Sequence, residues 1–182
     1  MTREERRHQL ARLIQEEPFI SDRELAQRFG VSVQTIRLDR ASLGIPQLRE
    51  RTRKLARMAY SQLRSVGADE VVGELLEMEL GRRALSVMET TERMALSGSG
   101  VVRGHHLFAQ ANSLAVSVID ASQALTGRAR LRFVKPVRVG ERVVAVATVV
   151  RQRQGRFWVD VESRVQGEPV FQGRFLVVVP GP

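Results

Sequence analysis

Residues 103–112, RGHHLFAQAN, place a cation, a glycine, two histidines and an amide within one short stretch. The guanidinium of Arg103 can form a two-point contact with a carboxylate or a phosphate. The stretch predicts a helix, and the free N–H groups at its start, from Gly104 and His105 onward, attract the same kind of anion. The amide of Asn112 can hydrogen-bond a carbonyl group. These residue types indicate a site for a small anionic ligand; the alternative is that Arg103 is a surface charge and Asn112 a satisfied core amide.

The same residues are poorly suited to catalysis. An amide has no titratable group at neutral pH, so Asn112 cannot act as a general base. His105 and His106 are neighbours on a helix and point about 100° apart, so at most one of them faces a given site. We therefore expect no catalytic residue. The chain has no cysteine, which excludes disulfides, thiol catalysis and zinc–cysteine sites, and we expect neither a metal nor a cofactor.

An apolar helix that runs from Gly104 to about Asp120 must position this site. Before it, residues 75–80 and 85–90 have strand-like sequences, although 70–80 also suits a short helix. After it the hydrophobic pattern has a period of two, which is typical of strands. The four segments with this pattern are 125–139, 142–150, 157–162 and 170–179. The order strand, strand, helix and four strands predicts an α+β protein with an antiparallel sheet wrapped around one helix.

The first 46 residues predict three short helices. The first ends before Pro18. Ser21 and Glu24 form a capping box that begins the second helix. Gly30 ends that helix, because glycine adopts the left-handed turn without a Cβ penalty, and Ser32 caps the third. This spacing is that of a helix-turn-helix DNA-binding module, with a helical dimerisation module as the alternative.

The third helix, about residues 33–43, is followed by an amphipathic helix at 47–66. We expect outward-facing polar side chains of both helices to reach base edges or phosphates of DNA, whereas Asp39 turns toward the module's own arginines. The candidate DNA-binding residues are Gln34, Thr35, Arg37, Arg40, Arg49, Arg51 and Arg53. For the 47–66 helix, an inert spacer is the alternative.

Length and composition indicate a globular protein of two domains. The 182 residues are 43% hydrophobic and 27% charged, and we expect a DNA-binding domain at 1–46, a linker helix at 47–66 and a second domain at 67–182. The net charge of +9 comes almost entirely from arginine, which suits DNA phosphates and an anionic ligand. No apolar run approaches the roughly 18–20 residues that span a bilayer, and no secretory signal is recognisable. We therefore expect a cytoplasmic protein without a membrane partner.

The order of elements over about residues 69–179 resembles the hot-dog fold of acyl-CoA thioesterases and dehydratases. Members that are enzymes usually place an acid near the start of the central helix, and the corresponding position here is Asn112. The resemblance therefore implies a hot-dog domain that lacks the catalytic acid.

Five motifs span both halves of the chain: PFISD at 18–22, VSVQTIRLDR at 31–40, IP at 45–46, LR at 48–49 and RGHHLFAQANSLA at 103–115. In these motifs the chain resembles the FapR family of bacterial repressors of fatty-acid and phospholipid biosynthesis genes. The resemblance implies a homodimer on an inverted-repeat DNA operator. Malonyl-CoA or malonyl-acyl carrier protein would release it by binding in the hot-dog domain.

The resemblance also implies roles for single residues. Arg103 would pair with the malonyl carboxylate, Asn112 would bond the malonyl group, and Gly104 would allow its close approach. Seven positions before the arginine, where the family tends to have an aromatic residue, this chain has Leu96. We expect binding to order the 96–104 loop and to move the linker helix onto the hot-dog domain. The alternatives are an acyl-CoA thioesterase with a DNA-binding appendage and a DeoR-like regulator that responds to another anion.

Overall fold

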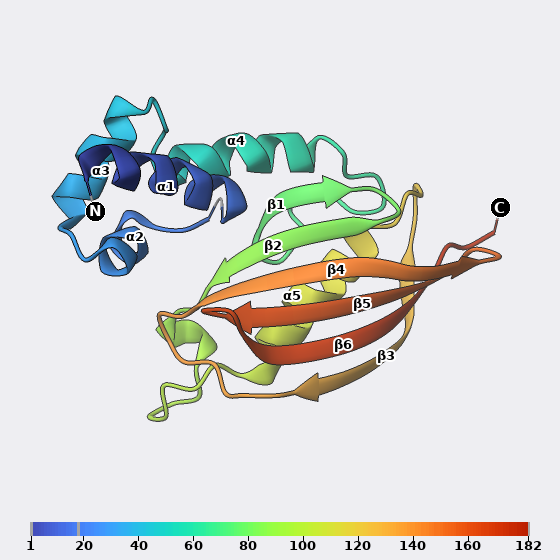
Figure 1. The fold of residues 1–182 in the computed structure, drawn as a ribbon. Helices are drawn as coiled ribbons and strands as arrows, with labels where there is room; N and C mark the ends of the chain where they lie inside the picture. Colours follow the sequence, from blue (N-terminus) through green and yellow to red (C-terminus); the bar gives the residue numbers. More distant parts are fainter. Residues whose placement is uncertain (1, 18, 182) are drawn as a thin grey trace. The chain divides into compact units, whose positions relative to one another are not determined.

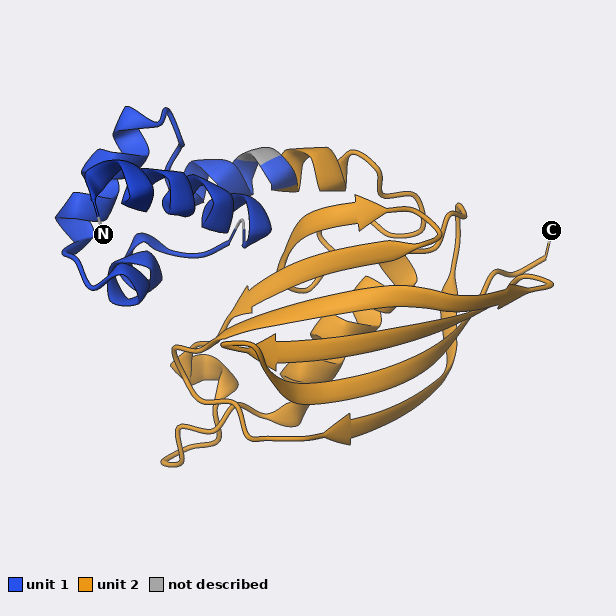
Figure 2. Cartoon of the chain, viewed as in Figure 1, with its two compact units in different colours: residues 1–55 blue, residues 56–182 orange. Residues whose placement is uncertain are grey.

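The computed structural model describes residues 2–17 and 19–181, which form two compact units, residues 1–55 and 56–182 (Figure 2). The boundary between the units falls within a helix. The first helix ends at Glu16, before position 18 as predicted, and Pro18 itself lies outside the described residues. Within the described ranges, no helix is both long and apolar enough to cross a membrane.

The N-terminal unit is helical. It comprises α1 (Arg3–Glu16), α2 (Asp22–Phe29), α3 (Val33–Ser42) and the first part of α4 (Leu48–Tyr60) (Figure 1). Ser21 and Glu24 form the predicted capping box, in which each side chain accepts the other residue's backbone N–H. Gly30 ends α2 with a φ of 63°, in the left-handed region, and Ser32 caps α3. The three local signals at these helix ends are thus confirmed.

A small apolar core joins these helices. Its buried members are Leu10, Ile14, Ile20, Leu25, Ala26 and Ile36. Full burial of a leucine or isoleucine side chain stabilises a fold by about 1.5–3 kcal/mol. The short side chain of Ala26 lies in this core, where α2 packs against α3. The core therefore fixes α3 on α2 and leaves one face of α3 outward.

The C-terminal unit is a six-stranded antiparallel sheet with the helix α5 (Gly104–Ser117) against one face (Figure 1). The strands are β1 (Glu74–Glu79), β2 (Arg83–Glu89), β3 (Leu125–Phe133), β4 (Arg142–Arg153), β5 (Arg156–Val165) and β6 (Glu168–Val178). They lie in the order β1-β2-β4-β5-β6-β3. The α+β class and the hot-dog arrangement are confirmed, and residues 75–79 belong to a strand rather than a helix, with Leu80 in the turn that follows. One short helix, η1 (Glu92–Met94), was not predicted.

The buried face of α5 packs against the middle of the sheet. Leu107, Ala111 and Leu114 of the helix are at most 2% exposed. On β4, the fully buried side chains in the same core include Ala145 and Ala147, which are small enough to let the helix approach closely. The start of α5 is therefore set by a rigid support, which a binding site needs.

Strand β3 ends at Phe133, earlier than the predicted 125–139. Pro136 cannot donate a ladder hydrogen bond, and the chain turns there toward the segment before α5. The Val102 N–H donates to the Val137 carbonyl over 2.8 Å, and Val101 forms an isolated bridge with Arg138. Residues 134–139 thus hold the chain just before α5 begins.

Helix α4 ends at Tyr60, earlier than the predicted 66. The Ser61 hydroxyl donates to the Met58 carbonyl over 2.7 Å, a local bond that competes with continuation of the helix. The Tyr60 hydroxyl accepts the Leu75 N–H over 3.3 Å. The last turn of α4 is therefore tied to β1 within the C-terminal unit.

Candidate functional sites

Arg103 is the N-cap of α5, and its side chain folds back on η1. Its backbone N–H donates to the Met94 carbonyl over 2.9 Å and its Nε to the same oxygen over 3.3 Å. Its Nη2 donates to the Arg93 carbonyl over 2.6 Å. Two carbonyl groups therefore hold the guanidinium, and no carboxylate in the described part of the chain pairs with it. Its charge is available to an external anion beside a helix N-terminus.

Gly104 lies directly beneath an aromatic ring. A Cβ at this position would lie 2.8 Å from Cε1 and Cζ of Phe133, too close for any real contact. The Phe133 ring is 51% exposed and stacks edge-on against Phe171, with ring centroids 5.3 Å apart. Phe133 was not among the predicted site residues, because only the crossing of β3 over the start of α5 brings it there. Glycine at 104 therefore admits the ring.

The loop before Arg103 is a tight hairpin. Ala95 and Val102 form a bridge, and the Leu96 N–H donates to the Val101 carbonyl over 2.8 Å. Gly98 and Gly100 both have positive φ, which their lack of a Cβ permits. The Leu96 side chain is 53% exposed. These backbone contacts define the hairpin, and the Leu96 side chain lies largely in solvent.

The two histidines of α5 differ in environment. His105 is exposed, whereas Nε2 of His106 is buried and has no hydrogen-bond partner in the described chain. The pKa of His106 lies below its ordinary value, first because the ring is removed from water and then because His105 and Arg103 repel its charged form. The lowered pKa favours the neutral ring of His106, so that this side chain is less suited than Arg103 to attract an anion.

Asn112 lies two turns farther along α5, where it faces β3. Its Oδ1 accepts a hydrogen bond from the Thr126 hydroxyl over 2.7 Å, and the side chain is half-buried. Its amide nitrogen makes no hydrogen bond with the described residues. The nine-residue step from Arg103 corresponds to about 13 Å along the helix. Within one chain, Arg103 and Asn112 are therefore too far apart to bind the same three-carbon acid.

Gln110 was not predicted as a structural residue, although a polar side chain on an apolar helix signals one. It is fully buried, and its Nε2 donates to the Ser86 carbonyl and the Val143 carbonyl, both over 3.3 Å. Its contacts with β2 and β4 fix the rotation of α5 about its axis. The directions of Arg103 and Asn112 follow from that rotation.

The outward face of α3 carries the predicted contacts near its start. Gln34 is exposed, and the Arg37 side chain is 61% exposed. Thr35 is half-buried, with its hydroxyl 2.9 Å from that of Ser32. Leu38 was missed because apolar residues were assigned inward, yet it is 59% exposed. An apolar side chain on this face is suited to contact a thymine methyl group.

Two predicted DNA contacts have structural roles instead. Arg40 is only 5% exposed, and its Nε and Nη2 donate to the two carboxylate oxygens of Asp22 over 3.0 and 3.1 Å. Arg51 is half-buried and donates to the carbonyls of Pro46 and Ile20. These guanidinium groups join α2, α3 and α4 within the N-terminal unit. Arg49 and Arg53 are exposed, as a DNA contact requires.

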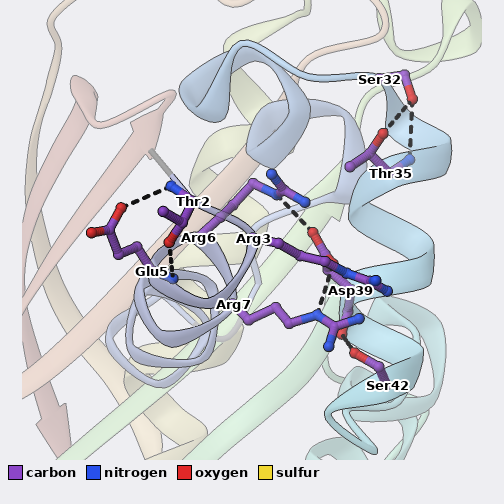
Figure 3. Close-up of polar contacts among 9 residues, drawn as sticks. All are labelled: Thr2, Arg3, Glu5, Arg6, Arg7, Ser32, Thr35, Asp39 and Ser42. Carbon is purple, nitrogen blue, oxygen red and sulfur yellow. Dashed lines mark hydrogen bonds and ion pairs between the residues drawn. The ribbon is translucent and has the colours of Figure 1, made fainter.

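Asp39 turns toward the module's own arginines, as predicted (Figure 3). It is 1% exposed, and its two carboxylate oxygens accept Nε of Arg6 over 2.7 Å and Nε of Arg7 over 2.9 Å. Nε of Arg3 lies 3.8 Å from the same group. Burial, the largest single effect, raises the pKa of Asp39, but the hydrogen bonds and positive charges of Arg6 and Arg7 together lower it by more, so that the pKa lies below its ordinary value.

This lowered pKa predicts acid sensitivity of the N-terminal unit. A carboxyl with a lower pKa in the folded state stabilises the fold above its unfolded pKa of about 3.9, and the stabilisation is lost as the pH falls through the folded pKa. We expect the free energy of unfolding to decrease as the pH is lowered below about 4. The decrease should be smaller in Asp39→Asn. Denaturant unfolding followed by circular dichroism from neutral to acid pH measures this. Identical pH profiles of the two proteins would contradict a stabilising role of ionised Asp39.

Comparisons with known proteins agree with both units. Residues 6–58 match the family model of the DeoR-like helix-turn-helix domain, and residues 101–174 match that of the thioesterase superfamily. Among solved structures, an uncharacterised protein of Pyrococcus horikoshii is similar with a TM-score of 0.62 and 27% identity, covering 66% of this chain and 93% of that one. A hypothetical thioesterase of Streptococcus pneumoniae, solved with coenzyme A, shares the fold with a TM-score of 0.55 and 16% identity, covering 72% and 96%.

Sequence relatives cover both units at once. The transcription factor FapR of Bacillus subtilis (strain 168) is 51% identical over 174 residues, 94% of this chain and 93% of the relative. FapR of Thermoanaerobacter sp. (strain X514) is 48% identical over 178 residues, 98% of this chain and 89% of the relative.

A helix-turn-helix unit followed by a hot-dog unit defines a DNA-binding transcription factor. Relatives of this length and similarity are named as transcription factors, not as enzymes. The chain belongs to the FapR family.

Proposed function

We propose that this transcription factor represses fatty-acid and phospholipid biosynthesis genes and leaves its operator when malonyl-CoA or malonyl-acyl carrier protein binds the hot-dog unit. The observation that carries the proposal is Arg103. Its guanidinium is held by the carbonyls of Arg93 and Met94 at the start of α5, and no described carboxylate neutralises it. Membership of the FapR family supports a role as a transcription factor.

The charge of Arg103 selects the class of ligand. A malonyl group ends in a carboxylate, whereas an acetyl group does not. A fixed guanidinium beside helical N–H groups favours the charged end. The backbone of Gly104 and His105 lies in this first turn of α5. An effector shifts a conformational equilibrium only through contacts that differ between the two states, and the carboxylate of the malonyl group provides such a contact.

We further propose that the protein acts as a homodimer in which two copies complete each site. Arg103 and Asn112 of one chain lie about 13 Å apart along α5, so Asn112 would reach the same malonyl group from the second copy. β3 is an edge strand whose Leu131 and Phe133 side chains are 38% and 51% exposed, a surface that a second copy would cover. A twofold dimer reads an inverted repeat.

The proposed DNA contacts on α3 and α4 are the half-buried Thr35 and the exposed residues Gln34, Arg37, Leu38, Arg49 and Arg53. Arg40 and Arg51 are left out, because their guanidinium groups bond within the unit. Binding of the effector would move α4 from a DNA-competent position toward the hot-dog unit.

Arg37 tests the DNA-binding face. Arg37→Ala is expected to weaken operator binding by about 1–3 kcal/mol through loss of a base contact, with no change in thermal unfolding, since the side chain is 61% exposed. Fluorescence anisotropy with labelled operator DNA measures the affinity. Arg12→Ala, in an exposed pair with Glu16 on α1, is the control and should bind as the wild type does. Unchanged affinity of Arg37→Ala would remove α3 from base recognition.

A thioesterase with a DNA-binding appendage is the competing function, favoured by the match of residues 101–174 to the thioesterase superfamily. The usual catalytic acid is absent from position 112, because Asn112 has no titratable group, and Nε2 of His106 is buried without a hydrogen-bond partner among the described residues. Release of free thiol from acyl-CoA distinguishes the two functions. Turnover of malonyl-CoA or acetyl-CoA by the purified chain would favour the enzyme.

A further inference from the structure

Three arginines of α1 converge on the single carboxylate of Asp39 (Figure 3). Arg3, Arg6 and Arg7 occupy positions i, i+3 and i+4, which share one face of a helix. One guanidinium would neutralise the carboxylate. The cluster therefore carries surplus positive charge.

The way these arginines bond leaves their outer ends open. Arg6 and Arg7 each use Nε for Asp39, and the terminal nitrogens of all three have no hydrogen-bond partner among residues 2–17 and 19–181. The side chains of Arg6, Arg7 and Arg3 are 14%, 24% and 68% exposed. A guanidinium that is oriented through Nε and open at its terminal nitrogens can still bind a phosphate.

The cluster borders the face that is proposed to read DNA. Asp39 follows Thr35 by four residues, so both lie on one side of α3, one turn apart. The arginines therefore extend from α1 beside the outward face of α3. In protein–DNA interfaces, phosphate contacts next to the recognition helix fix its register in the groove.

We propose that Arg3, Arg6 and Arg7 form a DNA phosphate-binding cluster that Asp39 orients, and that it places α3 in the major groove. The inference rests on the proposed DNA-binding function and adds a phosphate-binding element on α1.

Stability accounts for the pairs of Arg6 and Arg7 with the buried Asp39, but not for a third arginine. Exposed ion pairs contribute little, and like charges at i and i+4, the spacing of Arg3 and Arg7, repel each other. Arg3 is mostly exposed and 3.8 Å from Asp39. Of the acidic residues in the first turn of α1, Glu5 is tied to Thr2 in a capping box and Glu4 is exposed. The charge that remains faces solvent, where DNA phosphates would neutralise it.

The salt dependence of DNA binding tests this role. The full chain is titrated, at about 50–200 mM salt, against a labelled duplex that the wild-type protein selects from a random-sequence pool. Each lost phosphate contact lowers the slope of log affinity against log salt by about 0.9. We expect this decrease for Arg3→Ala and for Arg7→Ala. Arg12→Ala is the matched control, because it removes an arginine from the same helix outside the cluster, and its slope should equal that of the wild type.

Thermal unfolding separates the phosphate role from a structural one. Arg3→Ala should unfold at the wild-type temperature, so its slope remains interpretable even if Arg7→Ala folds poorly. Wild-type slopes for Arg3→Ala and Arg7→Ala, on a wild-type protein that binds DNA, would overturn the cluster and leave the DNA-binding function standing. A wild-type protein that selects no duplex would instead remove the proposed function, and this inference with it.

Discussion

Arg103→Ala is expected to bind operator DNA as the wild type does and to lose its response to malonyl-CoA. The guanidinium is the charged group at the start of α5 that we assign to the malonyl carboxylate, and it belongs to the C-terminal unit rather than to the helix-turn-helix unit. Removing one partner of a hydrogen-bonded charge pair weakens binding by about 2–5 kcal/mol. Release of the DNA would therefore need a malonyl-CoA concentration at least about 30-fold higher. A gel-shift titration of operator release measures this.

Arg93→Ala is the matched control for Arg103. The Arg93 side chain is exposed, and only its backbone carbonyl holds Arg103, so the variant removes a nearby positive charge without disturbing the guanidinium. It should respond almost as the wild type does. If Arg103→Ala still leaves the operator at wild-type malonyl-CoA concentrations, the effector binds elsewhere.

Arg40→Ala is expected to destabilise the N-terminal unit by about 3 kcal/mol or more, because removing one member of a buried ion pair leaves the other charge without compensation. Arg40 is 5% exposed, bonds both oxygens of Asp22 and also donates to the Ile45 carbonyl over 2.9 Å. Urea unfolding of the full chain, followed through helical circular dichroism, measures the loss.

Arg37→Ala is the control for the loss of stability expected in Arg40→Ala. Nε of Arg37 lies 3.7 Å from the same Asp22, but the side chain is 61% exposed, and exposed pairs contribute only about 0–1 kcal/mol. The two variants should therefore separate, with stability lost in Arg40→Ala and DNA affinity lost in Arg37→Ala. Equal stabilities would show that the Arg40 pair does not support the unit.

Much of the fold was predictable because its signals are local. The capping box of Ser21 and Glu24 and the left-handed Gly30 depend on residues a few positions apart. The sequence of elements along the chain from α5 onward follows from the hydrophobic period and the glycine turns, whereas residues 70–80 fitted either a strand or a helix. By contrast, Arg40 and Arg51 were assigned to DNA because a helical pattern does not reveal that carboxylate and carbonyl groups of other segments surround them.

The residues of the candidate site could be predicted from the sequence, but the groups that contact them could not. Arg103 at the start of α5 and Asn112 inside it follow from the sequence. Their partners do not: the Arg93 carbonyl comes from an unpredicted turn, Thr126 from β3, and Phe133 lies over Gly104 because β3 crosses the helix start. These contacts join segments that are distant in sequence or irregular in backbone.

Sensing of the malonyl carboxylate is tested most directly by comparing malonyl-CoA with acetyl-CoA in releasing the wild-type protein from its operator. The two molecules differ by the carboxylate that we assign to Arg103, whose guanidinium is held by the carbonyls of Arg93 and Met94. We predict that malonyl-CoA releases the DNA and that acetyl-CoA does not at the same concentration. Equal potency of the two thioesters would contradict the carboxylate-sensing role of Arg103.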